Sequence, residues 1–331
     1  MAALKKPLIN ILARSLLGAA LAFSANTVLA EEKLPVQQQT QVAGYYRMML
    51  GDYEITALYD GYVQIESKLL KGITANDVNK LFQAMYVNDS NGVQTAVNAF
   101  LVHTNKHLIL IDAGAESCFG DTLGSIENNL RAAGYTPEQV DTVLLTHLHP
   151  DHACGITKDG KRIFTNATLY VAQAEAGYWL SKKSEEQAPE AGKAVFKMAQ
   201  QAVAPYQAAN KFKTFTDRLP INEIQLMASP GHTPGHMSYL VTSKGNSLLI
   251  WGDIVHSHAL QFARPEVAIE YDSDSEQAVT SRKKILAYAA KNKLWVAGAH
   301  LPFPGLGHVR ANDNGYTWVP VEYSPILKKQ N

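Results

Sequence analysis

Apolar residues recur along the chain in short runs that predict β-strands. Between residues 44 and 65, β-prone runs alternate with two turn pairs, Gly51-Asp52 and Asp60-Gly61, which predicts a meander of three strands. Residues 96–102 and 107–111 flank a tight turn at Asn105 and predict a further strand pair. Other apolar runs predict strands at residues 142–146, 168–172, 224–228, 238–241, 247–251 and 294–297.

Helical periodicity occupies most of the segments between these strands. It predicts helices at residues 75–84, 125–133 and 275–291, and a long helical region at residues 174–209 that is interrupted near Pro189. Aromatic residues in the long region, among them Trp179 and Phe196, suit either the core or the wall of a pocket. The mixture of strands and helices, without a tandem repeat or an obvious linker, predicts one compact domain.

The densest group of polar residues follows the apolar run at residues 143–145. The segment Thr146-His147-Leu148-His149-Pro150-Asp151-His152 would be too polar for a core. His147 and His149 alternate as residues leaving a strand do, so they can point the same way. Asp151 and His152 lie on the next turn, where they can face a second ion. Imidazole and carboxylate suit zinc, iron or manganese; the alternative is a His-rich surface loop.

Further candidate ligands recur just after apolar β-runs, where catalytic residues are commonly placed on a rigid scaffold. One predicted ion takes His147, His149 and His232. The other takes Asp151, His152 and His300. The carboxylate of Asp253 bridges the two ions, and His236 is the alternative to His232. Asp112 ends a fully apolar strand and serves either as a partner of a ligand imidazole or as a simple turn former.

Such a pair of ions has a defined chemistry. Two ions about 3.5–4 Å apart can share a hydroxide, which gives a nucleophile at neutral pH and a Lewis-acidic face for the substrate oxygen. Asp253 would hold the bridge, and Asp151 or a metal-bound water would return a proton to the leaving oxygen. Asp151 and Asp253 are therefore the predicted catalytic residues.

The first thirty residues predict a secretory signal peptide. Lys5-Lys6 and Arg14 form a basic start, residues 15–25 are apolar and small, and Val28-Leu29-Ala30 fits a cleavage site after Ala30. The alternative, an N-terminal anchor, falls short of the roughly 20 residues that a span needs. We expect a periplasmic or secreted domain at residues 31–331, without stable membrane insertion after cleavage.

Charge and cysteine content add two further expectations. The signal segment carries three basic residues and no acidic ones, so its removal changes the balance from 30 against 30 to 27 basic against 30 acidic, a net charge of −3. A slightly acidic chain is a poor partner for nucleic acid. Cys118 and Cys154 are expected to be two buried thiols rather than a disulfide, although an oxidising compartment permits the bridge.

Taken in order, these motifs resemble the metallo-β-lactamase superfamily. The resemblance rests on the strand-borne His-x-His-x-Asp-His, on Gly231-His-Thr-Pro-Gly-His236, on the lone Asp253 and on the terminal His300. It implies the α+β class with an αββα sandwich, and a dinuclear site at one edge between the sheets. Two divalent metal ions are implied as cofactors; zinc is favoured, with iron, manganese or cobalt as alternatives.

Three segments narrow the resemblance to the methyl parathion hydrolase group and its lactonase-like relatives: residues 44–61, 133–141 and 300–308. The similarity covers roughly residues 43–324. It implies an aromatic pocket, whose matching positions here are Phe119, Trp179 and Phe196. The chain departs from the phosphotriester-cleaving member by carrying His256 and Tyr271 in place of leucines and Leu69 in place of an arginine.

The resemblance implies a hydrolase that opens small-molecule lactones or cleaves activated aryl esters by attack of a metal-bridging hydroxide. An organophosphate triester hydrolase is the alternative within the enzymes. A non-catalytic periplasmic metal-binding protein is the alternative from another class. A homodimer is compatible with the sequence.

Overall fold

The computed structural model describes residues 34–326. The chain divides into two compact units, Met1–Gln41 and Val42–Asn331. Of the first unit, residues 34–41 are described, and they contain neither a helix nor a strand. The signal peptide predicted at residues 1–30 lies outside the described residues.

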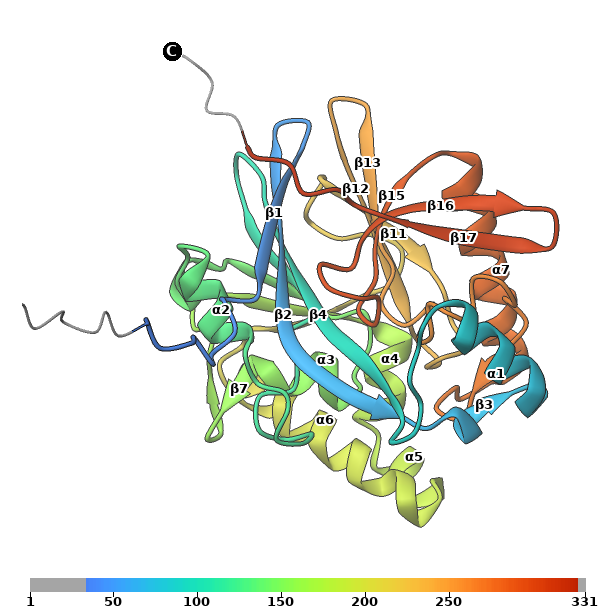
Figure 1. The fold of residues 1–331 in the computed structure, drawn as a ribbon. Coiled ribbons are helices and arrows are strands. Elements are labelled where there is room, and N and C mark those ends of the chain that lie inside the picture. Colours follow the sequence, from blue (N-terminus) through green and yellow to red (C-terminus); the bar gives the residue numbers. More distant parts are fainter. Residues whose placement is uncertain (1–33, 327–331) are drawn as a thin grey trace, which may run out of the picture. The chain divides into compact units, whose positions relative to one another are not determined.

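The second unit contains two large β-sheets (Figure 1). The first has seven strands in the order β1-β2-β4-β5-β6-β9-β10. Its strands are β1 (Tyr45–Leu50), β2 (Tyr53–Ile65), β4 (Val93–His103), β5 (Leu108–Ile111), β6 (Thr142–Leu144), β9 (Thr168–Ala172) and β10 (Phe212–Phe215). The first four strands pair antiparallel, and β5, β6, β9 and β10 pair parallel. Parallel strands are covered on both faces, which agrees with the burial of every residue of β5 and β6.

The three-stranded meander predicted for residues 44–65 is wrong at its second turn. Asp60 and Gly61 lie inside β2, where a bulge shifts the pairing with β4 between Tyr59 and Gly61. Gly61 has a φ of 145°, and a Cβ there would collide with the backbone of Thr122. The buried Asp60 carboxylate accepts hydrogen bonds from the backbone N–H groups of Ala115 (2.9 Å) and Ile126 (3.1 Å). The bulge therefore aims a side chain at a neighbouring loop without ending the strand.

The second sheet has six strands in the order β11-β12-β13-β15-β16-β17. They are β11 (Ile224–Ala228), β12 (Met237–Ser243), β13 (Asn246–Ile250), β15 (Trp295–Ala297), β16 (Leu306–Asn312) and β17 (Gly315–Pro320). Only β13 and β15 pair parallel. The hairpin of β16 and β17 was absent from the prediction, as was β10. The hairpin turn is the pair Asp313-Asn314, since Asn312 pairs with Gly315, and both residue types are common in turns.

The helices predicted at residues 75–84, 125–133 and 275–291 are confirmed with small shifts of their ends. The region predicted at residues 174–209 is divided into three helices, and a short helix at residues 150–153 was not predicted. The helices are α1 (Ala75–Ala84), α2 (Ile126–Ala132), α3 (Pro150–Ala153), α4 (Gln173–Trp179), α5 (Lys182–Gln187), α6 (Glu190–Ala208) and α7 (Ser275–Lys291). Three 3-10 turns occur at Ser67–Leu69, Pro137–Gln139 and Cys154–Ile156. Two small ribbons pair β3 (Leu70–Lys71) with β14 (Ala268–Ile269) and β7 (Thr157–Lys158) with β8 (Lys161–Arg162). Among residues 34–326, no helix combines the length and apolar character needed to cross a membrane.

Alternation along the strands sets the layers of the second unit. In β5, Leu110 belongs to a core cluster with Leu130 of α2 and Val203 of α6, whereas Ile109 faces a cluster shared with Tyr239 of the second sheet. The other face of the second sheet packs on α7. The order is thus helices, sheet, sheet, helix, and the predicted αββα sandwich is confirmed.

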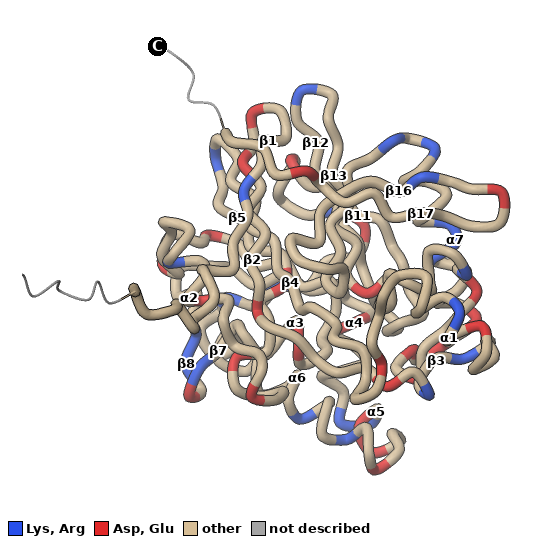
Figure 2. The backbone as a smooth tube through the Cα atoms, viewed as in Figure 1, with Lys and Arg blue, Asp and Glu red and all other residues tan. Residues whose placement is uncertain are grey.

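Among the described residues, cations are not gathered into a patch that would bind a polyanion such as nucleic acid. Figure 2 shows Lys and Arg dispersed among Asp and Glu over the loops and helices of the described chain. Binding to nucleic acid relies on clustered cations that neutralise several phosphates together. The view agrees with the charge balance of the sequence.

Candidate metal centre

The functional candidates meet at one edge of the two sheets because several strands end there. In the first sheet, β5 leads to Asp112 and the parallel β6 leads to the segment that begins at Thr146. In the second sheet, the parallel strands β13 and β15 lead to Asp253 and His300. β11 runs antiparallel to β12 and hence in the direction of β13, so it delivers the loop of His232 to the same edge.

The seven predicted ligand residues lie together in two groups of donor atoms. The first group is His147, His149, His232 and Asp253, and the second is Asp151, His152 and His300. Within each group the donor atoms lie within 4.8 Å of one another. Oδ2 of Asp253 is 3.1 Å from Nε2 of His232 and 3.1 Å from Nε2 of His300. Oδ1 of Asp253 is 3.1 Å from Nε2 of His152, so this carboxylate contacts both groups.

Unpartnered polar atoms test whether metal ions fit these groups. Nε2 of His147, Nε2 of His152 and Oδ1 of Asp253 are buried and make no hydrogen bond. A buried polar atom without a partner is costly and needs an explanation. These three atoms converge on one place, and nitrogen and oxygen donors of this kind bind zinc and similar divalent ions. The donor set therefore fits divalent metal ions.

A hydrogen-bonded relay fixes the orientation of two of the imidazoles. The Asp112 carboxylate accepts from the backbone N–H and the hydroxyl of Thr146 (both 2.8 Å) and from Nδ1 of His152 (2.9 Å). Because the Thr146 hydroxyl donates to Asp112, it accepts from Nδ1 of His147 at 3.0 Å. Both rings therefore donate a proton from Nδ1, and Nε2 is the atom that faces the centre. Of the two predicted roles of Asp112, the structure therefore supports partnership with an imidazole.

The hydrogen-bond partners of two other ligand histidines, His232 and His300, include a residue that the sequence did not predict. Asp272 accepts from Nδ1 of His232 at 3.0 Å and from the backbone N–H of Ile269 at 3.1 Å, and Arg282 lies 4.0 Å away. Nδ1 of His300 donates to the backbone carbonyl of Ala96 at 2.9 Å. Asp272 follows only the two-residue strand β14 and precedes a helix N-terminus, so in the sequence it resembles a turn residue.

The pKa values of the candidate ligand histidines are shifted in opposite directions. Burial lowers the pKa of His147 and His149 well below 6.5, and neighbouring imidazoles add to the effect. Burial also opposes charge on His152, but the carboxylates of Asp253, Asp151 and Asp112 outweigh it and raise the pKa well above 6.5. Asp253 and Asp272 likewise overcome burial and raise the pKa of His232 to about 9.

Two further histidines border the centre. Nε2 of His236 accepts from the backbone N–H of Asp253 at 3.0 Å, and Nδ1 lies 2.8 Å from Oγ of Ser229. Its nitrogens are thus engaged, and the alternative in which His236 replaces His232 as a ligand is wrong. Nε2 of His256 lies 3.1 Å from Oδ2 of Asp253, and the ring stacks on His300. His256, predicted to line the pocket, is therefore in direct contact with the centre.

The remaining pocket candidates fall into two kinds. The Trp179 ring lies 5.2 Å from the His149 ring, and Phe196 packs 4.5 Å behind Trp179 in the core. Phe119 and Tyr271 are 44% and 46% exposed. The substrate-pocket role of these residues stays a prediction.

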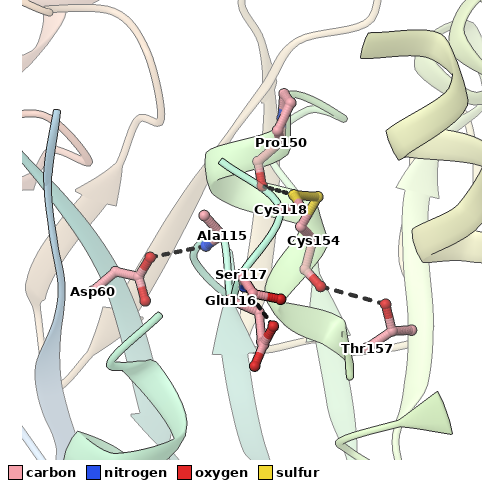
Figure 3. Close-up of a disulfide and its surroundings, with 8 residues drawn as sticks. All are labelled: Asp60, Ala115, Glu116, Ser117, Cys118, Pro150, Cys154 and Thr157. Atoms are coloured by element: carbon pink, nitrogen blue, oxygen red, sulfur yellow. Dashed lines mark hydrogen bonds between the residues drawn. A yellow bond between two sulfur atoms is a disulfide. The ribbon is translucent and has the colours of Figure 1, made fainter. Parts of the chain in front are cut away.

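Cys118 and Cys154 form a disulfide, so the expected pair of thiols is wrong (Figure 3). Their Cα atoms are 6.3 Å apart although 36 positions separate them in sequence. The fold explains the pairing, because β5 and β6 are adjacent parallel strands and the segments that follow them lie side by side. Cys154 comes directly after α3, which carries Asp151 and His152, so the bridge lies next to the second donor group.

Comparisons with known proteins agree with this geometry. Residues 92–300 match the model of the metallo-beta-lactamase superfamily. An N-acyl homoserine lactonase of Bacillus sp is 28% identical over 221 residues, which is 61% of this chain and 79% of that relative. An N-acyl homoserine lactonase of Bacillus cereus is 26% identical over 229 residues, 63% and 83% of the two chains.

Two solved structures are similar over most of the chain. The hydrolase AbOPH, described as in the beta lactamase superfamily, has a TM-score of 0.84 and 49% identity, and the match covers 86% of this chain and all of that one. AidC, a dizinc quorum-quenching lactonase in complex with a product, has a TM-score of 0.79 and 26% identity, covering 85% and 99%.

Proposed function

Because the chain belongs to the metallo-beta-lactamase superfamily and is a metal-dependent hydrolase, we propose that it opens the ring of lactones, with N-acyl homoserine lactones as the first candidates. Activated aryl esters form the wider substrate class. The observation that carries the proposal is the double donor group that shares Asp253. The N-acyl homoserine lactonases among the relatives support the choice of lactones.

Two divalent ions, with zinc favoured, would be held by His147, His149, Asp151, His152, His232, Asp253 and His300. Bound divalent ions lower the pKa of water and stabilise negative charge on a carbonyl oxygen. Surrounding imidazoles outweigh burial and keep the pKa of Asp253 well below 3.8, so its carboxylate stays ionised. His236 orients Asp253 by accepting its backbone N–H.

Asp151 is the residue placed to move a proton. Its Oδ2 lies 3.5 Å from Nε2 of His300 and 3.6 Å from Nε2 of His152, and its carboxylate is the more exposed of the two at the centre. Asp151 would take up the proton that water releases on adding to the lactone carbonyl, and would pass it to the departing ring oxygen as the C–O bond breaks. Trp179, packed on His149, would exclude water from one side and receive an apolar part of the substrate.

The cellular location proposed is the periplasm or the exterior. The signal-like segment at residues 1–30 supports it. The disulfide also supports it, because such bridges persist in oxidising compartments.

Metal analysis coupled to a substrate panel tests the proposal. We expect two equivalents of zinc per chain, and a higher kcat/KM for an N-acyl homoserine lactone and for dihydrocoumarin than for the organophosphate triester paraoxon. A higher kcat/KM for paraoxon would favour the organophosphate alternative. Zinc binding without turnover of any of the three, or of an aryl ester, would favour the metal-binding protein.

A further inference from the structure

Glu175 is a fully buried carboxylate that the proposed chemistry does not use. It is the third residue of α4, it is 0% exposed, and none of the ion pairs among the described residues involves it. Burial raises the pKa of Glu175, whereas the hydrogen bonds that it accepts from backbone N–H groups lower it. A carboxylate kept in such a place needs a specific reason.

Its two oxygens contact the two loops that carry ligand histidines. Oε1 accepts the backbone N–H of Leu148 at 2.9 Å, and Leu148 stands between His147 and His149. Oε2 accepts the backbone N–H of Gly235 at 2.9 Å, three residues after His232. One carboxylate therefore joins the loop that follows β6 in the first sheet to the loop between β11 and β12 in the second.

The packing around this connection leaves little freedom. A Cβ on Gly235 would lie 2.6 Å from Cα and 2.7 Å from Cβ of Glu175, so only glycine lets the second loop approach α4. At the far end of the same helix, Trp179 packs on His149. Nδ1 of His149 and Nε2 of His232 are 3.0 Å apart across the two loops. Their closeness depends on how the loops are held together.

We propose that Glu175 is a positioning residue, which joins the two ligand loops and presets the distance between His149 and His232 for one metal ion. The inference rests on the proposed two-metal function for the identity of that ligand. It differs from a purely structural role, since it predicts that loss of Glu175 weakens the ion of the first group and leaves the ion of Asp151, His152 and His300 in place.

Three variants of the full chain separate position from charge. Glu175→Gln removes the charge and one acceptor, and Glu175→Asp keeps the charge but is too short to reach both amides. If the position of the carboxylate matters, both variants raise the dissociation constant of the zinc ion of the first group about 10–100-fold. This is the usual range for residues that support metal ligands. If Glu175 acts only through its charge, Glu175→Asp keeps the wild-type affinity. Asp60→Asn is the matched control, because Asp60 is also a buried carboxylate that accepts two backbone N–H groups.

The readouts are zinc dissociation constants from chelator competition, kcat and KM at low and saturating zinc, and the Tm of the metal-free protein. We expect Glu175→Gln and Glu175→Asp to lose kcat at limiting zinc and to regain most of it at saturating zinc. KM should stay within about threefold of the wild-type value, because neither variant removes a contact with the substrate. Asp60→Asn should lower the Tm with both zinc constants unchanged. A lower Tm with unchanged zinc constants in the Glu175 variants would overturn the proposal.

A double mutant identifies the ion concerned. His149→Ala already disables the first group, so adding Glu175→Gln should leave the dissociation constant of the remaining ion unchanged. A further rise of tenfold or more would overturn the assignment of Glu175 to the first group. The proposed function fails separately, if wild-type protein binds fewer than two zinc ions or hydrolyses no lactone.

Discussion

The two donor groups of the centre are built in different ways. The first combines His147 and His149 from the loop after β6 with His232 from the other sheet, and it has no carboxylate besides the shared Asp253. The second has a carboxylate of its own, and Asp151 and His152 come from the single helix α3. Both groups span the two sheets, because His300 follows β15 of the second sheet, but the second group has two of its ligands on one helix and carries more negative charge.

The outer supports follow the same division. The first group relies on Asp272 and, as we propose, on Glu175. Asp112 contacts His152 directly and reaches His147 only through the Thr146 hydroxyl. The second group should therefore bind its ion more tightly, and the first should be more sensitive to changes in geometry.

Substitution of Asp253, the shared carboxylate, should impair both donor groups together. Asp253→Ala takes away the carboxylate that contacts imidazoles of both groups, so we expect kcat/KM to fall on the order of 10³-fold even at saturating zinc. Steady-state lactonase kinetics with zinc analysis would check this. A variant that keeps more than a tenth of the wild-type activity would show that Asp253 is not shared.

Removing one imidazole from each group should reveal which ion is held more tightly. We expect His149→Ala and His152→Ala each to retain one zinc ion and to lose roughly 10²–10³-fold in kcat. The ion left in His149→Ala has Asp151 beside it, and an extra charge at close range favours a cation. Its dissociation constant should be at least about tenfold lower than that of the ion left in His152→Ala. Equal constants would contradict the proposed difference in charge.

The supporting carboxylates offer a matched pair of substitutions. Asp272→Asn should weaken only the ion of the first group, by about 10–100-fold. Asp112→Asn should weaken the ion of the second group by a similar factor and that of the first by less, because it reaches His147 through Thr146. Competition titrations that resolve two constants would test this. If Asp272→Asn weakened both ions equally, the supports would not be separate.

The sequence predicted which residues would lie together at the centre because each carries a local signal. His147, His232, Asp253 and His300 all stand just beyond an apolar run, and the strand-end rule needs no knowledge of the partner. Glu175 and Asp272 carry no such signal. In the sequence, Glu175 is an acidic residue in the first turn of a helix, a position where an exposed acid is common, and its partners are 27 and 60 residues away.

The fold was predicted where local pattern decides the structure and missed where a distant contact does. Helix α7 was predicted with the bounds that the structure has, because its periodicity is continuous and Asp274 caps it. Asp60-Gly61 has the composition of a turn, yet contacts with Ala115 and Ile126 keep it within β2. The Cys118–Cys154 bridge likewise depends on the parallel pairing of β5 and β6, which no local pattern reveals.

The opposite pKa shifts of the buried histidines should give the metal-free protein a maximum of stability near pH 6.5. His147 and His149 have a lowered pKa, so their burial destabilises the fold as pH falls below 6.5, where the unfolded imidazoles gain protons. His232 has a pKa raised to about 9, so its contribution is full below 6.5 and is lost as pH rises towards 9. Asp272→Asn should flatten the alkaline side of the Tm profile. An unchanged alkaline side would contradict the role of Asp272.

Loss of the disulfide should have the smallest effect on activity, because the bridge lies next to α3 without contacting the ligands. For the double variant Cys118→Ser and Cys154→Ser we expect the free energy of unfolding to fall by about 3–4 kcal/mol, as for a loop of this length. Because Asp112 and the backbone of α3 still hold His152, kcat at saturating zinc should change by less than about threefold. Denaturant unfolding and steady-state kinetics measure the two effects. A change of tenfold or more in the dissociation constant of the second ion would show that α3 is held in place by the bridge and that the second group is less local than its sequence suggests.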